Sequence, residues 1–253
     1  MTRRVPLRAA PLVAAALALV VSLTGCGAPA DLPPTPTGID LRGADARDGN
    51  GLWLRSGSAV TDIVAEAVRT GGPVRISGEI TETVQPEPDA EPRPGRTLTL
   101  DFRGTASAFA ATVRAGDVRI DAVVSADGSR VKGNAAFARQ YAGREAGAVV
   151  CTSGLDPVLL DVAPLLEPAG LVSALLGAGG VGANPPVGDA ETLDVVTGEE
   201  GSVVGVLTVE RFGPPLPRSF VAADASGEGA LEFSAWGEPV DLDAAAAELP
   251  CDD

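Results

Sequence analysis

The sequence contains no histidine, and Lys132 is its only lysine. Without histidine the chain cannot build a Ser-His-Asp or Cys-His catalytic arrangement, or a zinc site with histidine ligands. Lys132 stands in the polar stretch 128–133, so we interpret it as a solvated surface charge rather than a base or Schiff-base former. There is also no P-loop, no G-x-S-x-G motif, no Cys/His cluster and no loop with calcium-ligand spacing. We therefore predict no enzyme, no cofactor and no metal site.

Basic residues are scarce as well, with 19 Lys and Arg against 34 Asp and Glu and a net charge of −15. Such an acidic chain is poorly suited to the phosphate backbone of nucleic acid. Anionic lipid surfaces would also repel it, so membrane attachment must come from a covalent anchor. Some acidic residues could pair as catalytic carboxylates. With so many of them a chance pair is inevitable, and we interpret them as solvated surface charges.

Residues 1–25 have the three parts of a bacterial secretion signal. Three arginines precede the apolar run Ala9–Leu23, and small residues follow it. The run is shorter than the roughly 20 apolar residues that span a bilayer, which disfavours a permanent transmembrane helix. Leu23–Cys26 matches the lipobox of bacterial lipoproteins; the alternative is an ordinary signal with a chance cysteine. We expect cleavage before Cys26, acylation of Cys26, and a lipid-anchored protein on the extracytoplasmic face of the cell membrane.

Removal of residues 1–25 takes away three arginines and no acidic residue, which changes the net charge from −15 to −18. With Cys26 used by the anchor, two cysteines are left, Cys151 and Cys251. Two cysteines in an exported protein usually pair. The alternative is one buried thiol and one thiol in a frayed tail. We predict a disulfide between them.

The domain organisation follows from composition. Residues 26–50 are rich in Pro, Gly, Ala and Asp and have few large apolar side chains, so they indicate a flexible spacer. Residues 51–253 contain no further linker and no repeat of 20–50 residues. They are expected to form a single domain.

Three stretches have helical periodicity. Apolar residues recur on one face of Ser58–Thr70, with Ser58 as the expected N-cap. A short helix is predicted over 135–141, capped by Asn134. Leucine-rich residues 157–176 have helical spacing interrupted by two prolines, which predicts a broken helical segment.

Alternating apolar and polar residues predict two groups of strands on either side of this segment, at 74–81, 97–103, 109–113, 118–124 and 148–151, and at 191–196, 202–211, 218–224 and 229–236. Between them, Gln85–Gly95 is expected to be an exposed loop. Gly177–Gly182 has G-x-G-x-x-G spacing but follows a helix, so it is expected to be a flexible loop and not a nucleotide site. An alanine-rich tail leads to Cys251. The fold class is α+β: a curved antiparallel sheet with one wet face and helices over its concave, apolar face.

Three stretches carry a resemblance to a known family: Val131–Phe137, Phe212–Arg218 and Leu231–Val240. Together with the lipobox, the spacer and the leucine-rich block before a Gly-rich loop, they resemble the LppX/LprG-type lipoproteins of mycobacteria and related actinobacteria. The sequence departs from the family in its Pro/Glu insert at 85–95. The resemblance implies a half-barrel sheet that encloses an apolar cavity with its helices. It also implies a protein that carries acylated lipids or glycolipids through the cell envelope.

The expected partners are therefore an acylated lipid or glycolipid, the membrane through the anchor, and an unidentified membrane transporter. Leu171 and Leu175 would form the lid of the cavity, and small residues such as Ala122 and Gly205 would leave volume for acyl chains. The predicted lining is Ile76, Ile80, Leu100, Phe102, Val113, Ile120, Ala122, Leu171, Leu175, Gly205, Leu207, Val209 and Phe233. The alternative is a core filled by helix side chains, in a surface-tethered structural or accessory lipoprotein that acts through protein contacts.

Overall fold

The computed structural model describes residues 49–84, 93–177, 179–199, 202–222 and 229–251, and all of them belong to the unit Ala44–Asp253. The predicted signal sequence and Cys26 lie outside these residues. So does the predicted spacer, except for Gly49 and Asn50.

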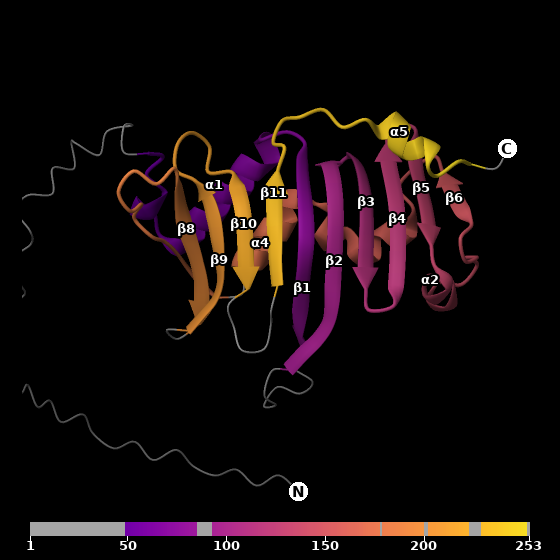
Figure 1. Ribbon diagram of the computed structural model, residues 1–253, viewed down its shortest axis with the longest axis horizontal. Helices are drawn as coiled ribbons and strands as arrows, with labels where there is room; N and C mark the ends of the chain where they lie inside the picture. The colour runs from indigo at the N-terminus through magenta and orange to yellow at the C-terminus, as the bar shows by residue number, and fades with distance from the viewer. Residues whose placement is uncertain (1–48, 85–92, 178, 200–201, 223–228, 252–253) are drawn as a thin grey trace, which may run out of the picture. The chain divides into compact units, whose positions relative to one another are not determined.

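Within the described residues, eleven strands form one open sheet in the order β6-β5-β4-β3-β2-β1-β11-β10-β9-β8-β7 (Figure 1). Every neighbouring pair is antiparallel. The two predicted strand groups are confirmed, and they join where β1 pairs with β11. The strands are β1 Val74–Val84, β2 Arg93–Thr105, β3 Ala108–Ala115, β4 Val118–Ser125, β5 Gly128–Gly133, β6 Val149–Thr152, β7 Gly180–Ala183, β8 Thr192–Glu199, β9 Ser202–Glu210, β10 Pro217–Ala222 and β11 Gly229–Ser234.

All helical segments except α5 lie on one face of this sheet, and Figure 1 shows α1 and α4 behind it. Helix α1 turns its apolar stripe, which includes Val60 and Val64, into the main core. The predicted broken segment 157–176 is confirmed as η2, α3 and α4. The segments are η1 Leu52–Leu54, α1 Gly57–Thr70, α2 Ala135–Gln140, η2 Pro157–Val162, α3 Ala163–Leu166, α4 Pro168–Leu176 and α5 Leu242–Ala247.

Among the described residues, no single helix has the length and apolar character needed to cross a bilayer. Pro157–Leu166 and Pro168–Leu176 meet that test only when taken together, and they are bent by 58° relative to each other.

The N-cap predicted for the first long helix is wrong. Ser58 lies inside α1, and Ser56, with an extended backbone, is the N-cap. The helix starts early because Gly57 lets its first turn approach β7. A Cβ on Gly57 would lie 2.5 Å from the carbonyl oxygen of Val181.

Two strands lie where the sequence predicted polar surface or loop. Residues 128–133 form β5, because Ser129 and Val131 are buried in alternation with the half-buried Arg130 and Lys132. The alternation of buried and half-buried positions is hard to recognise in the sequence, because most of the buried positions hold small or polar residues. The predicted flexible loop at 177–182 contains the start of β7, an edge strand that pairs with β8.

The predicted exposed loop at 85–95 is also shorter than expected, since β2 already begins at Arg93. Residues 85–92 lie outside the described residues. Pro94 pairs with Thr83, and β3 reaches only to Leu98 on the other side of β2. Proline is tolerated in the strand there because that edge needs no N–H donor.

The alanine-rich tail is not unstructured. It forms α5, which packs Ala245 and Leu249 against Ala110 and Val123 on the sheet face opposite the main core. The sequence predicted that this second face is exposed to water. Part of it is instead covered by α5. Ala110 and Val123 gave no signal because alanine and valine are common on exposed strand positions.

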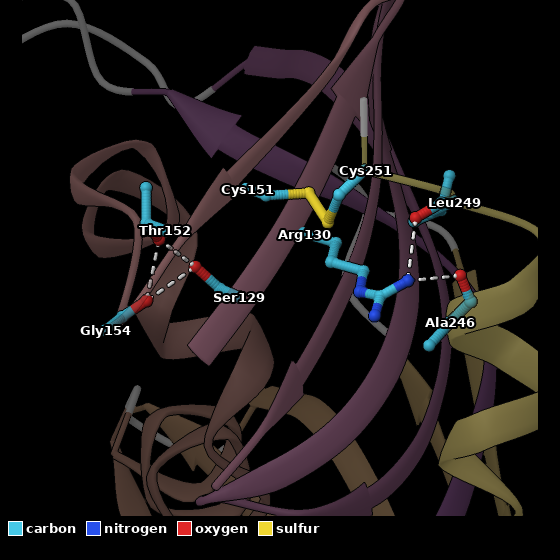
Figure 2. The surroundings of a disulfide bond; sticks show 8 residues. All are labelled: Ser129, Arg130, Cys151, Thr152, Gly154, Ala246, Leu249 and Cys251. Carbon is cyan, nitrogen blue, oxygen red and sulfur yellow. Dashed lines mark hydrogen bonds between the residues drawn. A yellow bond between two sulfur atoms is a disulfide. The ribbon is translucent and has the colours of Figure 1, made fainter. Parts of the chain in front are cut away.

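The predicted disulfide is present and ties this tail to the edge strand β6 (Figure 2). Cys151 and Cys251 have Cα atoms 6.0 Å apart. Next to them, Arg130 Nη1 donates hydrogen bonds to the carbonyl oxygens of Ala246 (2.8 Å) and Leu249 (3.2 Å). The covalent bond, the guanidinium and the small apolar cluster together hold α5 on the sheet.

Candidate functional site

The strand residues predicted to line a cavity lie on the helix-covered face, but most belong to a packed core. Ile76, Phe102, Leu207 and Val209 are each 0% exposed. The side chains of α1 and α4 pack into the same cluster. Packed interiors leave few voids larger than a water molecule. The face around these residues of β1, β2 and β9 is therefore filled.

The two small residues expected to leave volume for acyl chains, Gly205 and Ala122, lie in different surroundings. A Cβ on Gly205 would lie 2.6 Å from Cζ of Phe220, so the Phe220 ring occupies the space above this glycine. Ala122 is buried in the main core cluster beside Ala111, its partner on β3. Leu171 and Leu175 belong to α4, where Leu171 is buried and Leu175 packs against the core from a partly buried position.

An open pocket of about 370 Å³ lies at one end of this face, between the sheet and the helical segments η2 and α3. Two of the predicted lining residues, Val113 and Ile120, are part of its floor. Leu171 and Leu175 are not part of its lining, and η2 and α3 form the wall opposite the sheet instead. The floor comprises Leu98, Val113, Ala115, Val118 and Ile120, the opposite wall Asp161, Val162, Pro164 and Leu165, and the remaining lining Arg96, Gln140 and Tyr141.

The polar groups of the pocket are grouped around Tyr141. Burial raises the pKa of Tyr141 above its ordinary value, and a hydrogen bond with Asp161 and the negative charge of Asp161 raise it further. The positive charge of Arg96 acts in the opposite direction. The phenol is therefore neutral at physiological pH. The pocket thus offers neutral and charged hydrogen-bonding groups on one side and an apolar floor on the other.

Helix α2 positions Tyr141 through a short chain of contacts. Asn134 Oδ1 accepts a hydrogen bond from the backbone N–H of Phe137 (3.0 Å), which caps the helix as the sequence predicted. The Phe137 ring packs on Tyr141 with centroids 4.8 Å apart. A Cβ on Gly133 would lie 2.0 Å from Cδ1 of Phe137, so only glycine lets α2 lie this close to β5.

A buried ion pair fixes the start of η2, which leads into the pocket wall. Arg144 Nη2 donates to Asp156 Oδ1, and their side chains are 13% and 0% exposed. The same Asp156 oxygen accepts the backbone N–H of Val158 (3.0 Å), and the N–H of Asp156 donates to Ser129 Oγ (2.9 Å). Figure 2 shows Ser129 beside Thr152 and Gly154 on the neighbouring strand and loop. The charge pair thus ties the segment after α2 to η2, and the Ser129 hydrogen bond ties η2 to β5.

No group of three or more His, Cys, Asp or Glu side chains within the described ranges could hold a metal ion. A second hollow of about 270 Å³ lies beside α5 and is lined by charged residues such as Arg103, Arg119 and Glu248. Its cations and carboxylates are interleaved, and Arg119 is paired with Asp121. The pocket beside η2 is therefore the better candidate for an apolar ligand.

Sequence reasoning missed the residues that close the pocket. Tyr141 was expected only as the end of a short helix, and Asp161, Pro164 and Leu165 only as part of a broken helical segment. Pro164 carried the one available signal, because proline lacks a backbone N–H donor and breaks a helix, which marks a change of chain direction there. The distance in sequence between Arg96 and this segment gave no sign that they meet.

No protein-family model matches the chain. No curated protein matches it either. Among solved structures it is similar to LprF from Mycobacterium bovis, at 12% identity over 74% of this chain and 97% of that one, with a TM-score of 0.39. LppX from Mycobacterium tuberculosis matches at 16% identity over 72% of this chain and 94% of that one, with a TM-score of 0.38. A putative outer membrane lipoprotein-sorting protein domain from Vibrio parahaemolyticus matches at 9% identity over 81% and 98%, with a TM-score of 0.24. The likeness to LppX/LprG-type lipoproteins that the sequence predicts is thus also found by comparing structures, and at these scores it stays a likeness.

Proposed function

We propose that this chain is a lipid-anchored lipoprotein of the cell envelope that binds and carries an acylated lipid or glycolipid, without a catalytic step. The observation that carries the proposal is the open apolar pocket between β2–β4 and η2–α3. Its floor holds an alkyl chain, and its polar residues contact the part of the lipid that carries hydroxyl or ester groups.

The size and lining of the pocket set the class of ligand. About 370 Å³ lies near the lower end of the range of ~300–1,000 Å³ for ligand pockets, which suits one alkyl chain rather than several. Each methylene buried there contributes about 0.8 kcal/mol, so binding needs no charged contact. The strongly acidic chain disfavours anionic head groups and favours neutral or glycosylated lipids.

Blocking the pocket should abolish lipid binding without unfolding the protein. Ala115 lies in the pocket floor and is only partly buried, so Ala115→Phe should fill the space with a ring. The expected result is a clear fall in the lipid recovered by organic extraction and mass spectrometry of non-acylated protein, since a loss of about 1.4 kcal/mol already lowers the affinity tenfold.

Ala183→Phe is the matched control, because Ala183 is a partly buried strand alanine that packs against the main core on β7, outside the pocket. It should keep its lipid. Equal lipid recovery from both variants and the parent would exclude this pocket as the binding site, and absence of lipid from the parent would contradict the function.

The second candidate function is a structural or accessory lipoprotein that acts through protein contacts. The filled core around Ile76, Phe102 and Leu207 favours it, because this part of the face holds no ligand volume. The two functions separate in the same extraction experiment. An accessory protein yields no specific lipid from the parent and no difference between the two alanine variants.

The anchor is a separate part of the proposal and depends on the sulfur of Cys26. The variant Cys26→Ala should keep its signal sequence and carry no diacylglycerol. Two acyl chains give stable anchoring, whereas one chain gives only marginal binding. Intact-mass measurement checks this, and a diacylglyceryl mass on the Cys26→Ala protein would contradict it.

A further inference from the structure

The outer side of the pocket wall is an exposed apolar surface. Leu155 and Leu160 are 51% and 61% exposed. In a 3₁₀ helix, side chains three residues apart lie above one another, so Pro157 and Leu160 form one outward row of η2. Val158 and Leu159, which lie between them, are buried in the core. The same short helix therefore turns one apolar side to the core and another to the solvent.

This surface is nearly free of charge, although the protein carries a net charge of −15. Asp156 and Asp161 are the charged residues of 155–166. Asp156 is fully buried and paired with Arg144, whereas Asp161 is exposed and lies in the pocket lining, where it interacts with Tyr141. Bringing this surface against an apolar phase therefore removes few hydrated charges from water, which keeps the desolvation cost low.

The exposed surface is continuous with the pocket. Val162 at the end of η2 and Pro164 and Leu165 in α3 line the pocket, and Pro164 is itself exposed. A lipid that left a bilayer through water would expose its whole alkyl chain, at about 0.8 kcal/mol for each methylene. A pocket that opens next to a bilayer avoids that cost.

The predicted anchor keeps a bilayer within reach of this surface. The chain joins the fold at Asn50, whose side chain donates to the carbonyl oxygen of Glu210 and whose N–H donates to that of Arg211. Covalent geometry allows the stretch from Cys26 to Asn50 to span at most about 80 Å. The anchor therefore imposes no orientation by itself, and the face that meets the bilayer is chosen by its chemistry.

We propose that the docking surface, formed by Leu155, Pro157, Leu160 and Pro164, rests on the lipid bilayer to which the protein is anchored, so that the pocket opens at the interface of lipid and water. The inference rests on the proposed function for its purpose, lipid exchange with the bilayer. Docking itself depends only on the apolar side chains and is measured without any pocket ligand.

The test uses the chain from residue 26 onward, which contains every described residue, coupled through the Cys26 sulfur to a maleimide phospholipid. The vesicles contain phosphatidylcholine with brominated acyl chains, which quench tryptophan at short range. Leu160→Trp is the reporter, and Val187→Trp is the control. Val187 is 85% exposed and lies between β7 and β8, at the far edge of the sheet from β6. Quenching of the parent, which contains Trp53 and Trp236, is subtracted.

We expect Leu160→Trp to lose fluorescence in brominated but not in unbrominated vesicles, and Val187→Trp to lose none. Adding Leu155→Ser to the reporter should reduce the quenching, because binding scales with the apolar area buried. Equal quenching at both positions, or quenching only with added phosphatidylglycerol, would overturn the docking surface. A dimer in solution that Leu160→Ser dissociates would also overturn it, because a second copy of the chain would then cover the surface. A protein that yields lipid on extraction but shows no quenching keeps the proposed function and loses only this inference.

Discussion

Replacing Arg144 by methionine should lower the free energy of unfolding by about 3–5 kcal/mol, the cost of breaking a buried ion pair on one side. Asp156 is 0% exposed, so Arg144→Met leaves its carboxylate in the interior without a cation. Among the described residues, Arg144 Nη1 and Asp156 Oδ2 make no hydrogen bond, so the carboxylate would keep only the N–H of Val158 on Oδ1. Urea unfolding should show a lower midpoint with an unchanged slope.

The matched control is Arg218→Met, which removes an arginine from another carboxylate pair. Arg218 Nε lies 2.7 Å from Glu210 Oε1, but these side chains are 51% and 29% exposed. Solvent screens such a pair, so the expected loss is only ~0–1 kcal/mol. The two variants differ in burial and not in chemistry. Equal losses in both would show that the burial of Asp156 carries no energetic weight.

The large antiparallel sheet could be predicted because the alternation of apolar and polar residues is clear where the buried positions hold large apolar side chains. Val74, Ile76, Leu100 and Phe102 alternate with polar residues and all are buried. The pattern fails where burial is achieved with small side chains. In β5, Ser129 and Gly133 face the interior, and neither residue type signals a core position. The alanine-rich α5 escaped detection for the same reason, because its contacts involve small side chains.

The candidate pocket could be predicted only in part, because packing and not pattern decides which part of an apolar face stays open. Ile76 and Ile120 occupy equivalent positions in their strands and both are buried. Only Ile120 lines the pocket, since α1 and α4 fill the face elsewhere and the shorter η2 and α3 do not. The small volume of a single residue is likewise not enough to predict open space beside it. The space above Gly205 is taken by the Phe220 ring, which reaches it from the neighbouring strand.

Loss of the disulfide through Cys251→Ser should lower the free energy of unfolding by about 2–5 kcal/mol. The bond closes a loop with a sequence separation of 100 residues. For such a loop, chain entropy in the unfolded state accounts for about 4.7 kcal/mol, and measured values are usually smaller. The folded state is weakened as well, because a helix as short as α5 is not stable by itself. It depends on the disulfide, on Arg130 and on Ala110 and Val123.

The single and double variants distinguish the bond from its two side chains. Cys151→Ser, Cys251→Ser and the double variant should lose the same free energy, because either change removes the same covalent link. In a Cys26→Ser background, denatured but unreduced protein should contain no free thiol. Two titratable thiols, or a double variant that costs the sum of the single ones, would mean that the two cysteines act separately. The C-terminal helix would then be held only by the guanidinium of Arg130 on β5 and by the small apolar cluster, and not by the edge strand β6.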